Sequence, residues 1–267
     1  MRPVLLSVLM TLLCSAAEAQ VTCPYSTWTD YRGTPLLKHP SAKAYLYASS
    51  EVKVDADGAP NAYHPDDVGL NCRTGTGFKG LDCPANAGYP NASWWRDALV
   101  ADPDNANRAF VQPAGPFAGF FVSMTSLEDS AKAKTDPARY VDSTAVPYIV
   151  FPRSFYKMDG TGRMGDLGYA VNPDKGVSSP FVVAEIGPSD AILGEMSIAL
   201  AEALGGSAPN PRTGAGAPAG KMLYVVFPKS SRDHPWPLAP ADLAPLVDAL
   251  LNEVGGADAA TACRNAL

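Results

Sequence analysis

Two acidic residues in the segment 181–204 have the types and spacing that acid–base chemistry requires. The segment reads FVVAEIGPSDAILGEMSIALAEAL, so an apolar run of strand character ends at Glu185, just before a turn made by Gly187 and Pro188. Glu195 follows ten residues after Glu185 and opens a stretch with helical periodicity. A strand, a turn and a helix start would bring the two carboxylates to one place. Such a pair can serve as general acid and general base, which cleavage of a glycosidic bond requires.

Each carboxylate also has a structural interpretation. An acid in the first turn of a helix stabilises the helix dipole or completes a capping box, which would explain Glu195 without catalysis. Glu185 could be held in an ion pair. Asp190 lies between the two on the turn and is the alternative partner for Glu195.

Further polar residues could line the same groove. Asp55 and Asp57 belong to a DADG stretch (55–58), which is typical of a turn and lacks the remaining ligands of a calcium loop. Their carboxylates, and His64 a few residues later, could instead contact a substrate. Asp166 precedes an apolar run, where it is either a turn residue or a third carboxylate at the site.

Aromatic residues give two further candidates. Trp95, with its neighbour Trp94, and Trp236 could stack on the faces of sugar rings. Tryptophan suits a protein interior equally well, so both interpretations stay open. A metal site is not expected, because the sequence has no cysteine pair at zinc-ligand spacing and no histidine cluster. Hydrolysis by two carboxylates needs no cofactor.

The elements that would position these residues are short. Apolar runs between turn signals predict strands at 109–112, 119–124, 148–151, 168–171, 181–184 and 222–227. Helical periodicity predicts two helices, at 195–204 and 241–254. This indicates a mainly β protein with flanking helices, of the α+β class. The order of the elements resembles that of double-psi β-barrels. A GDL stretch (165–167) is followed by a strand, an Asn-Pro-Asp turn, a second strand, an acidic Gly-Pro turn and a helix. The resemblance implies a six-stranded double-psi-like barrel core, with one helix after the Gly-Pro turn and one at the C-terminus.

Residues 1–19 have the features of a signal peptide. Arg2 precedes a short apolar run (4–13), and Ala17-Glu18-Ala19 matches a small-x-small cleavage site. We therefore expect a secreted protein, either extracellular or periplasmic. Four cysteines remain after cleavage, which suits two disulfides in an oxidising compartment. Among the possible pairings we favour Cys72–Cys83 and Cys23–Cys263.

The charge balance restricts the class of partner. The formal net charge is −6 and stays −6 without residues 1–19, because that segment carries one Arg and one Glu. A chain without a basic excess is not expected to bind nucleic acid. No segment after residue 19 is apolar enough to span a membrane. We expect a soluble monomer that acts on a neutral or cationic polysaccharide.

Six motifs recur in the same order in one known family: 140–142 (YVD), 146–152 (VPYIVFP), 165–167 (GDL), 185–188 (EIGP), 194–201 (GEMSIALA) and 224–228 (YVVFP). Together they resemble the chitosanases of glycoside hydrolase family 75, over about residues 52–236 of this chain. The resemblance implies a hydrolase domain at 51–238. From the organisation of the chain we expect an N-terminal arm at 20–50 and a C-terminal helix in 239–267 packed on the same domain.

The resemblance also implies a reaction. Family members hydrolyse β-1,4-linked glucosamine polymers internally and with inversion, using an Asp on the turn and the Glu of the Gly-Glu-x-Ser motif. That Glu corresponds to Glu195, which would be the general acid. The position of the Asp is occupied by Glu185, which follows Ala184 rather than a glycine, on a turn longer by one residue. Glu185 would be the base that activates water, with Asp190 as the substitute.

Two other functions are compatible with the same sequence. A non-catalytic carbohydrate-binding or cell-wall-binding protein would keep the scaffold without the chemistry. A peptidoglycan-cleaving lytic transglycosylase would need only one acid. For an inverting hydrolase we expect the two carboxyl groups to lie roughly 6.5–9.5 Å apart across an open groove.

Overall fold

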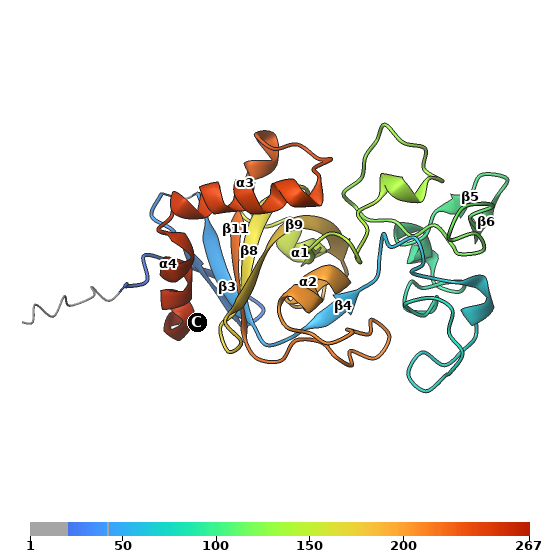
Figure 1. The fold of residues 1–267 in the computed structure, drawn as a ribbon, viewed down its shortest axis with the longest axis horizontal. Coiled ribbons are helices and arrows are strands. Elements are labelled where there is room, and N and C mark those ends of the chain that lie inside the picture. The colour runs from blue at the N-terminus through green and yellow to red at the C-terminus, as the bar shows by residue number, and fades with distance from the viewer. Residues whose placement is uncertain (1–20, 42) are drawn as a thin grey trace, which may run out of the picture.

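The computed structural model describes residues 21–41 and 43–267, so the predicted signal peptide (1–19) lies outside the described residues. Its main feature is a nine-stranded mixed sheet with the strand order β1-β2-β3-β11-β8-β9-β7-β10-β4 (Figure 1). These strands are β1 (Ser26–Tyr31), β2 (Thr34–Lys38), β3 (Tyr45–Ser49), β4 (Lys53–Asp55), β7 (Tyr148–Pro152), β8 (Leu167–Asn172), β9 (Val177–Gly187), β10 (Glu195–Ser197) and β11 (Met222–Phe227). The molecule is thus mainly β with flanking helices.

Strand direction changes along the sheet. From β1 to β9 every neighbouring pair is antiparallel. β7 then runs parallel to β9, β10 antiparallel to β7, and β4 parallel to β10. Because β9, β7, β10 and β4 are neighbours, side chains from distant parts of the chain come together at this end of the sheet.

Apolar side chains are buried on both faces of the sheet. Along β7, Ile149 and Phe151 belong to one hydrophobic core, whereas Tyr148 and Val150 belong to a second. Helices α1 (Arg153–Tyr156) and α2 (Ile198–Ala203) pack into the first core, and α3 (Pro240–Asn252) and α4 (Gly256–Ala262) cover the second (Figure 1). Strands buried on both faces read as continuous apolar runs. For this reason the runs at 148–151, 168–171, 181–184 and 222–227 correctly predicted β7, β8, β9 and β11.

Three other expectations for these elements need correction or extension. Glu195 does not open a helix: it begins strand β10, and α2 starts only at Ile198. The expected arm contributes strands β1, β2 and β3 to the main sheet. The predicted C-terminal helix is present as α3, and a further helix, α4, follows it.

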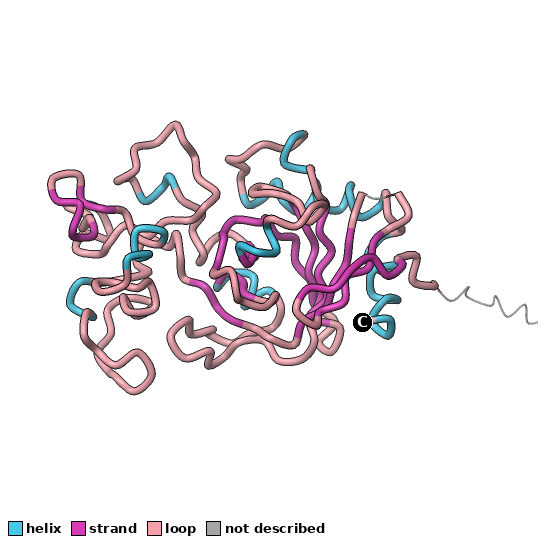
Figure 2. Tube along the Cα trace, turned by 180° about the vertical axis from the view of Figure 1, so that it is seen from behind, coloured by secondary structure: helices cyan, strands magenta, loops and turns pink. Residues whose placement is uncertain are grey.

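A loop-rich region between β4 and β7 lies beside the sheet (Figure 2). It contains a two-stranded sheet formed by β5 (Ala101–Asp102) and β6 (Asn105–Ala109). The strand predicted at 119–124 is reduced to isolated bridges, such as Val111–Phe121. Trp95 and Phe121 from this region belong to the first core, so the region packs directly on the sheet. Over residues 21–41 and 43–267, five short 3-10 helices complete the fold: Pro65–Asp67, Ser93–Asp97, Pro137–Arg139, Ser230–Arg232 and Cys263–Ala266.

The described cysteines form two disulfides, Cys23–Cys263 and Cys72–Cys83, the pairings favoured from the sequence. They indicate a protein that folds in an oxidising, non-cytoplasmic environment. Within the described part of the chain, every helix is too short or too polar to cross a lipid bilayer.

Candidate active site

Glu185 and Glu195 both line one pocket of about 810 Å³ at the β9–β7–β10–β4 end of the sheet. Glu185 lies opposite Val150 of β7, and Met196 lies opposite Ile149, which puts Glu195 next to Val150 on the other side. The two glutamates therefore flank one strand. A Cβ atom added at Gly187 would lie 3.6 Å from the Oε2 atom of Glu195. The Glu195 carboxylate therefore reaches the end of β9.

An irregularity in β9 determines where Glu185 points. Val183 pairs with Ile149, but the next residue of β7, Val150, pairs with Glu185, so Ala184 is an extra residue on β9. A bulge of this kind re-aims the side chains that follow it. Glu185 and Val150 consequently face the same pocket.

The Glu185 carboxylate is buried and held by three donors. Its Oε2 accepts the backbone N–H of Ser126 at 2.7 Å. Its Oε1 accepts the Ser126 hydroxyl at 2.6 Å and the N–H of Ile186 at 2.6 Å. Burial raises the pKa of Glu185 to about 7, although the three hydrogen bonds act in the opposite direction. Glu185 thus has a fixed orientation and a proton affinity suited to acid–base chemistry near neutral pH.

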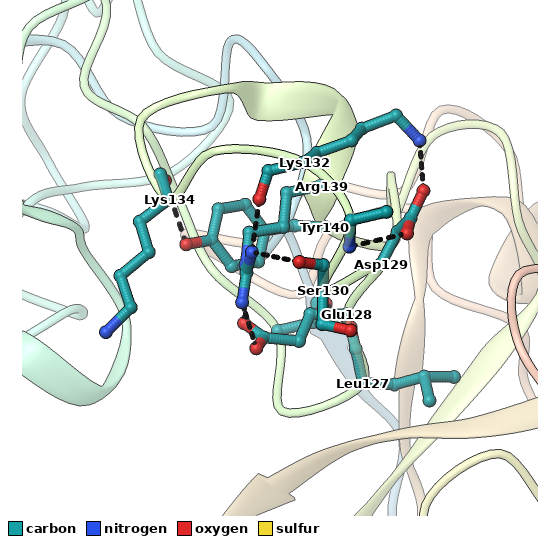
Figure 3. A network of polar contacts seen from close by, with 10 residues as sticks. Leu127, Glu128, Asp129, Ser130, Lys132, Lys134, Arg139 and Tyr140 are labelled. Atoms are coloured by element: carbon teal, nitrogen blue, oxygen red, sulfur yellow. Dashed lines mark hydrogen bonds and ion pairs between the residues drawn. The ribbon is translucent and has the colours of Figure 1, made fainter.

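The loop that carries Ser126 is itself rigidly held. Leu127 donates its N–H to the carbonyl of Ala184 in β9 at 2.9 Å. Arg139 donates to the Glu128 carboxylate, at 2.9 Å from Nε to Oε2, and to the carbonyls of Ser130 and Lys132 (Figure 3). This network joins the two ends of the 128–139 loop and so supports the donors of Glu185.

Glu195 is in a different environment. Among the described residues, none donates a hydrogen bond to its carboxylate, which is partly exposed to the pocket. Burial raises the pKa of Glu195, the cation of Lys53 on β4 lowers it, and the charge of Asp82 raises it. A raised pKa and a free carboxyl group are what a proton donor to a bound substrate requires.

Asp55 and Asp57 join the two glutamates in the pocket. The Tyr148 hydroxyl lies 3.1 Å from Asp55 Oδ2 and 2.9 Å from the carbonyl oxygen of Asp57. Asp57 Oδ1 accepts the hydroxyls of Tyr63 (2.8 Å) and Ser123 (3.0 Å). Burial raises the pKa of both aspartates, and each is raised further by neighbouring acids: Asp55 by Asp57, and Asp57 by Glu185. The pocket therefore favours bound protons or a bound cation.

The opposite wall of the pocket comes from the loop-rich region. It contains Trp94, which the sequence offered together with Trp95, and two residues that the sequence did not single out, Asp82 and Arg212. Trp94 is 49% exposed and lines the pocket, whereas Trp95, the predicted residue of this pair, is buried and does not. The Trp94 ring lies against Gly88, where an added Cβ would approach it to 2.9 Å. Asp82 and Arg212 also line this wall. Only the Trp94-Trp95 pair gave a signal in the sequence.

The remaining predicted residues lie elsewhere. Asp190 is exposed on the turn and does not line the pocket. Asp166 is buried and accepts the backbone N–H groups of Arg163, Lys229 and Ser231. His64 caps a 3-10 helix by accepting the N–H of Asp66.

Trp236 lines a second pocket of about 530 Å³, together with Gly58 of the Asp57–Gly58 turn. Gly58 has φ +78°, and a Cβ there would meet the carbonyl oxygen of Val141 at 2.0 Å, so this turn requires glycine. Asp57 lines the first pocket and Gly58 the second, so this turn borders both.

The described residues contain no group of three or more His, Cys, Asp or Glu side chains arranged to hold a metal ion. A comparison of the chain with models of known protein families found no match, and a comparison with curated proteins found no significant match.

Proposed function

We propose that this protein is a glycoside hydrolase that cleaves chitosan, a β-1,4-linked glucosamine polymer, internally and with inversion. The observation that carries the proposal is the convergence of Glu185 and Glu195 on one pocket from two strands that flank β7. Neighbouring strands lie about 4.8 Å apart, so the backbones of the two residues are separated by about 9–10 Å. An inverting pair needs room for a water molecule between its carboxyl groups, and two side chains that enter one pocket from opposite sides of β7 can leave that room.

The two carboxylates differ in the way that two catalytic roles require. Glu185 is held by three hydrogen bonds, which suits a base that must orient one water molecule toward the anomeric carbon. Glu195 has a free carboxyl group with a raised pKa, which suits an acid that must reach the leaving oxygen. Water attacks as Glu185 takes its proton, while Glu195 protonates the departing sugar, so the configuration at the anomeric carbon inverts.

The proposal is tested by measuring reducing ends released from chitosan by the native chain and by two variants. Glu185→Gln and Glu195→Gln are each expected to lower kcat by at least about 100-fold. Asp190→Asn is the matched control, because this acid lies outside the pocket, and its activity is expected to equal that of the native chain. The proposal also requires that the first product have inverted anomeric configuration, measured by NMR.

Other outcomes would replace the proposal. If the native chain binds chitosan without cleaving it, the protein is a carbohydrate-binding module. If it forms anhydro-sugars from peptidoglycan, it is a lytic transglycosylase. If Asp190→Asn abolishes cleavage and Glu185→Gln does not, Asp190 is the partner of Glu195.

Two finer predictions belong to this proposal. The first is that the core of the sheet is a six-stranded double-psi β-barrel, which the order of the GDL stretch, the strands, the two turns and the helix supports. The second is secretion, to the periplasm or the medium, which the two disulfides support. An exported protein would meet polysaccharide outside the cytoplasm, as a monomer that needs no cofactor for the hydrolysis.

A further inference from the structure

Asp55 is a buried acid to which the proposed reaction gives no role. It ends β4, is only 8% exposed and lines the same pocket as the two glutamates. Among the described residues, no lysine, arginine or histidine forms an ion pair with its carboxyl group. Burial of an ionised carboxylate without a cation is costly, so a group in this situation normally binds a proton instead.

The contacts of the Tyr148 hydroxyl indicate that Asp55 carries such a proton. This hydroxyl lies 2.9 Å from the carbonyl oxygen of Asp57 and 3.1 Å from Oδ2 of Asp55. It has a single proton, and the carbonyl oxygen, which can only accept, takes that proton over the shorter distance. The contact with Asp55 then uses a lone pair of the Tyr148 oxygen, so it is a hydrogen bond only if Oδ2 carries a proton and donates it.

The second oxygen of Asp55 completes the pattern of a neutral carboxylic acid. Oδ1 accepts the N–H of Asp57 at 2.9 Å. One oxygen of the carboxyl group therefore accepts and the other donates. Because β10 lies between β7 and β4 in the sheet, the bond to Tyr148 also joins β4 to β7 beside the pocket.

Asp57, two residues later, has the pattern of an ionised carboxylate. Its Oδ1 accepts the hydroxyl groups of Tyr63 at 2.8 Å and Ser123 at 3.0 Å. Both hydroxyl donors favour the charged form and oppose the effect of burial on the pKa of Asp57. Two adjacent acids in such different surroundings share one proton unequally, and this proton resides on Asp55.

Charged groups face Asp55 from the neighbouring strands. Asp57 follows on the same turn, Glu195 lies on β10 and Glu185 on β9. Burial raises the pKa of Asp55, and the negative charges of these three acids raise it further. Lys53 of β4 lies opposite Glu195 in the β10–β4 pairing. Acids that interact in this way affect one another mutually, so a charge on Asp55 would make Glu185 harder to ionise.

We propose that Asp55 is a neutral carboxylic acid that donates to the Tyr148 hydroxyl and leaves the charge of the aspartate pair on Asp57. It acts as a positioning residue, because it keeps one negative charge out of the pocket and so lets Glu185 ionise as the base. The role toward the base rests on the proposed function, whereas the protonated state of Asp55 does not.

The test is an NMR titration that does not depend on cleavage. In the native chain with ¹³C-labelled aspartate and glutamate carboxyl groups, an aspartate signal should keep the chemical shift of a protonated acid at pH 8. Asp55→Asn should remove that signal. Asparagine offers the same donor and acceptor without a charge, so the pKa of Glu185, assigned with Glu185→Gln, should stay at about 7. Asp57→Asn is the matched contrast: it removes the charge of the pair and should lower the pKa of Glu185 by about one pH unit.

Asp55 is not the neutral acid if every aspartate of the native chain is ionised at pH 8, or if the protonated signal persists in Asp55→Asn. The first of these measurements uses the native chain alone, so it decides even if the variants do not fold. The proposal is also wrong if Asp55→Asn lowers the pKa of Glu185 as much as Asp57→Asn does, or if Asp57→Asn leaves it unchanged.

The titration and the cleavage assay can fail separately. If the NMR results are as expected but the native chain releases no reducing ends from chitosan, the hydrolase proposal fails and the neutral acid stands. If chitosan is cleaved and every aspartate is ionised at pH 8, the reverse holds.

Discussion

Two opposing influences set the pKa of the Glu185 carboxyl group. Burial raises its pKa to about 7, while the Ser126 and Ile186 donors favour the charged form. As the base, Glu185 must be ionised, so kcat/KM on a soluble glucosamine oligomer should fall as the pH drops below about 7. If Glu185 is instead the acid, activity should be lost above that pH. A pH profile of the native chain therefore assigns the roles.

Ser126→Ala removes one of the donors that stabilise ionised Glu185. It should move the midpoint of this pH profile upward by about one pH unit.

The same carboxylate should make the stability of the protein depend on pH. Its pKa rises from 4.5 in the unfolded chain to about 7 in the folded one, so the folded state binds more protons between these values. The free energy of unfolding therefore falls as the pH rises through that window, by on the order of 3 kcal/mol. Glu185→Gln should remove this contribution. Urea unfolding of both proteins at pH 4.5 and 7.5 checks it, and an equal pH dependence in the two would contradict it.

At the scale of elements, Ser197 connects β10, β7 and α2. Its buried Oγ accepts the N–H groups of Leu200 and Tyr148 and donates to the carbonyl of Val146. Ser197→Ala leaves these groups unpaired and removes the cap of α2, so we expect a loss of about 2–3 kcal/mol in unfolding free energy. Ser178→Ala, at an exposed position of β9, should change stability by less than about 0.5 kcal/mol. Denaturant unfolding of the two variants tests the difference.

The same element shows where sequence reasoning succeeds and where it stops. β7, β8, β9 and β11 are buried on both faces, so their apolar runs predict them directly. β10 has only three residues, and its strand conformation comes from pairing with β4 and β7, which are far away in sequence. Local periodicity therefore assigned Glu195 to a helix. The residue was still a candidate because its carboxylate, not its element, carries the chemistry.

At the scale of the whole molecule, the pocket lies between the sheet and the loop-rich region. One wall of the pocket is formed by the sheet and carries Glu185 and Glu195. The apolar pattern of the strands and the spacing of these two carboxylates could predict that wall. The opposite wall, with Asp82 and Trp94, is built by irregular loops whose path depends on packing and a disulfide. No periodicity marks such residues, because loops have no repeating burial pattern. Of the tryptophans that the sequence offered, Trp95 and Trp236 lie outside this pocket and only Trp94 lines it.

The two disulfides should have separable effects on the molecule. Cys23–Cys263 closes a loop with a sequence separation of 240, and Cys72–Cys83 closes one of only 11. Chain entropy predicts a loss of about 5 kcal/mol on removing the first and about 3 kcal/mol on removing the second. The first joins the two ends of the chain at the side remote from the loop-rich region (Figure 1), so its double Ser variant should have a lower Tm but still release reducing ends from chitosan. The second adjoins Asp82 in the wall of the pocket, so its double Ser variant should release fewer reducing ends despite the smaller change in Tm. Thermal unfolding and reducing-end release of both variants check this, and a loss of cleavage only in the Cys23/Cys263 variant would contradict it.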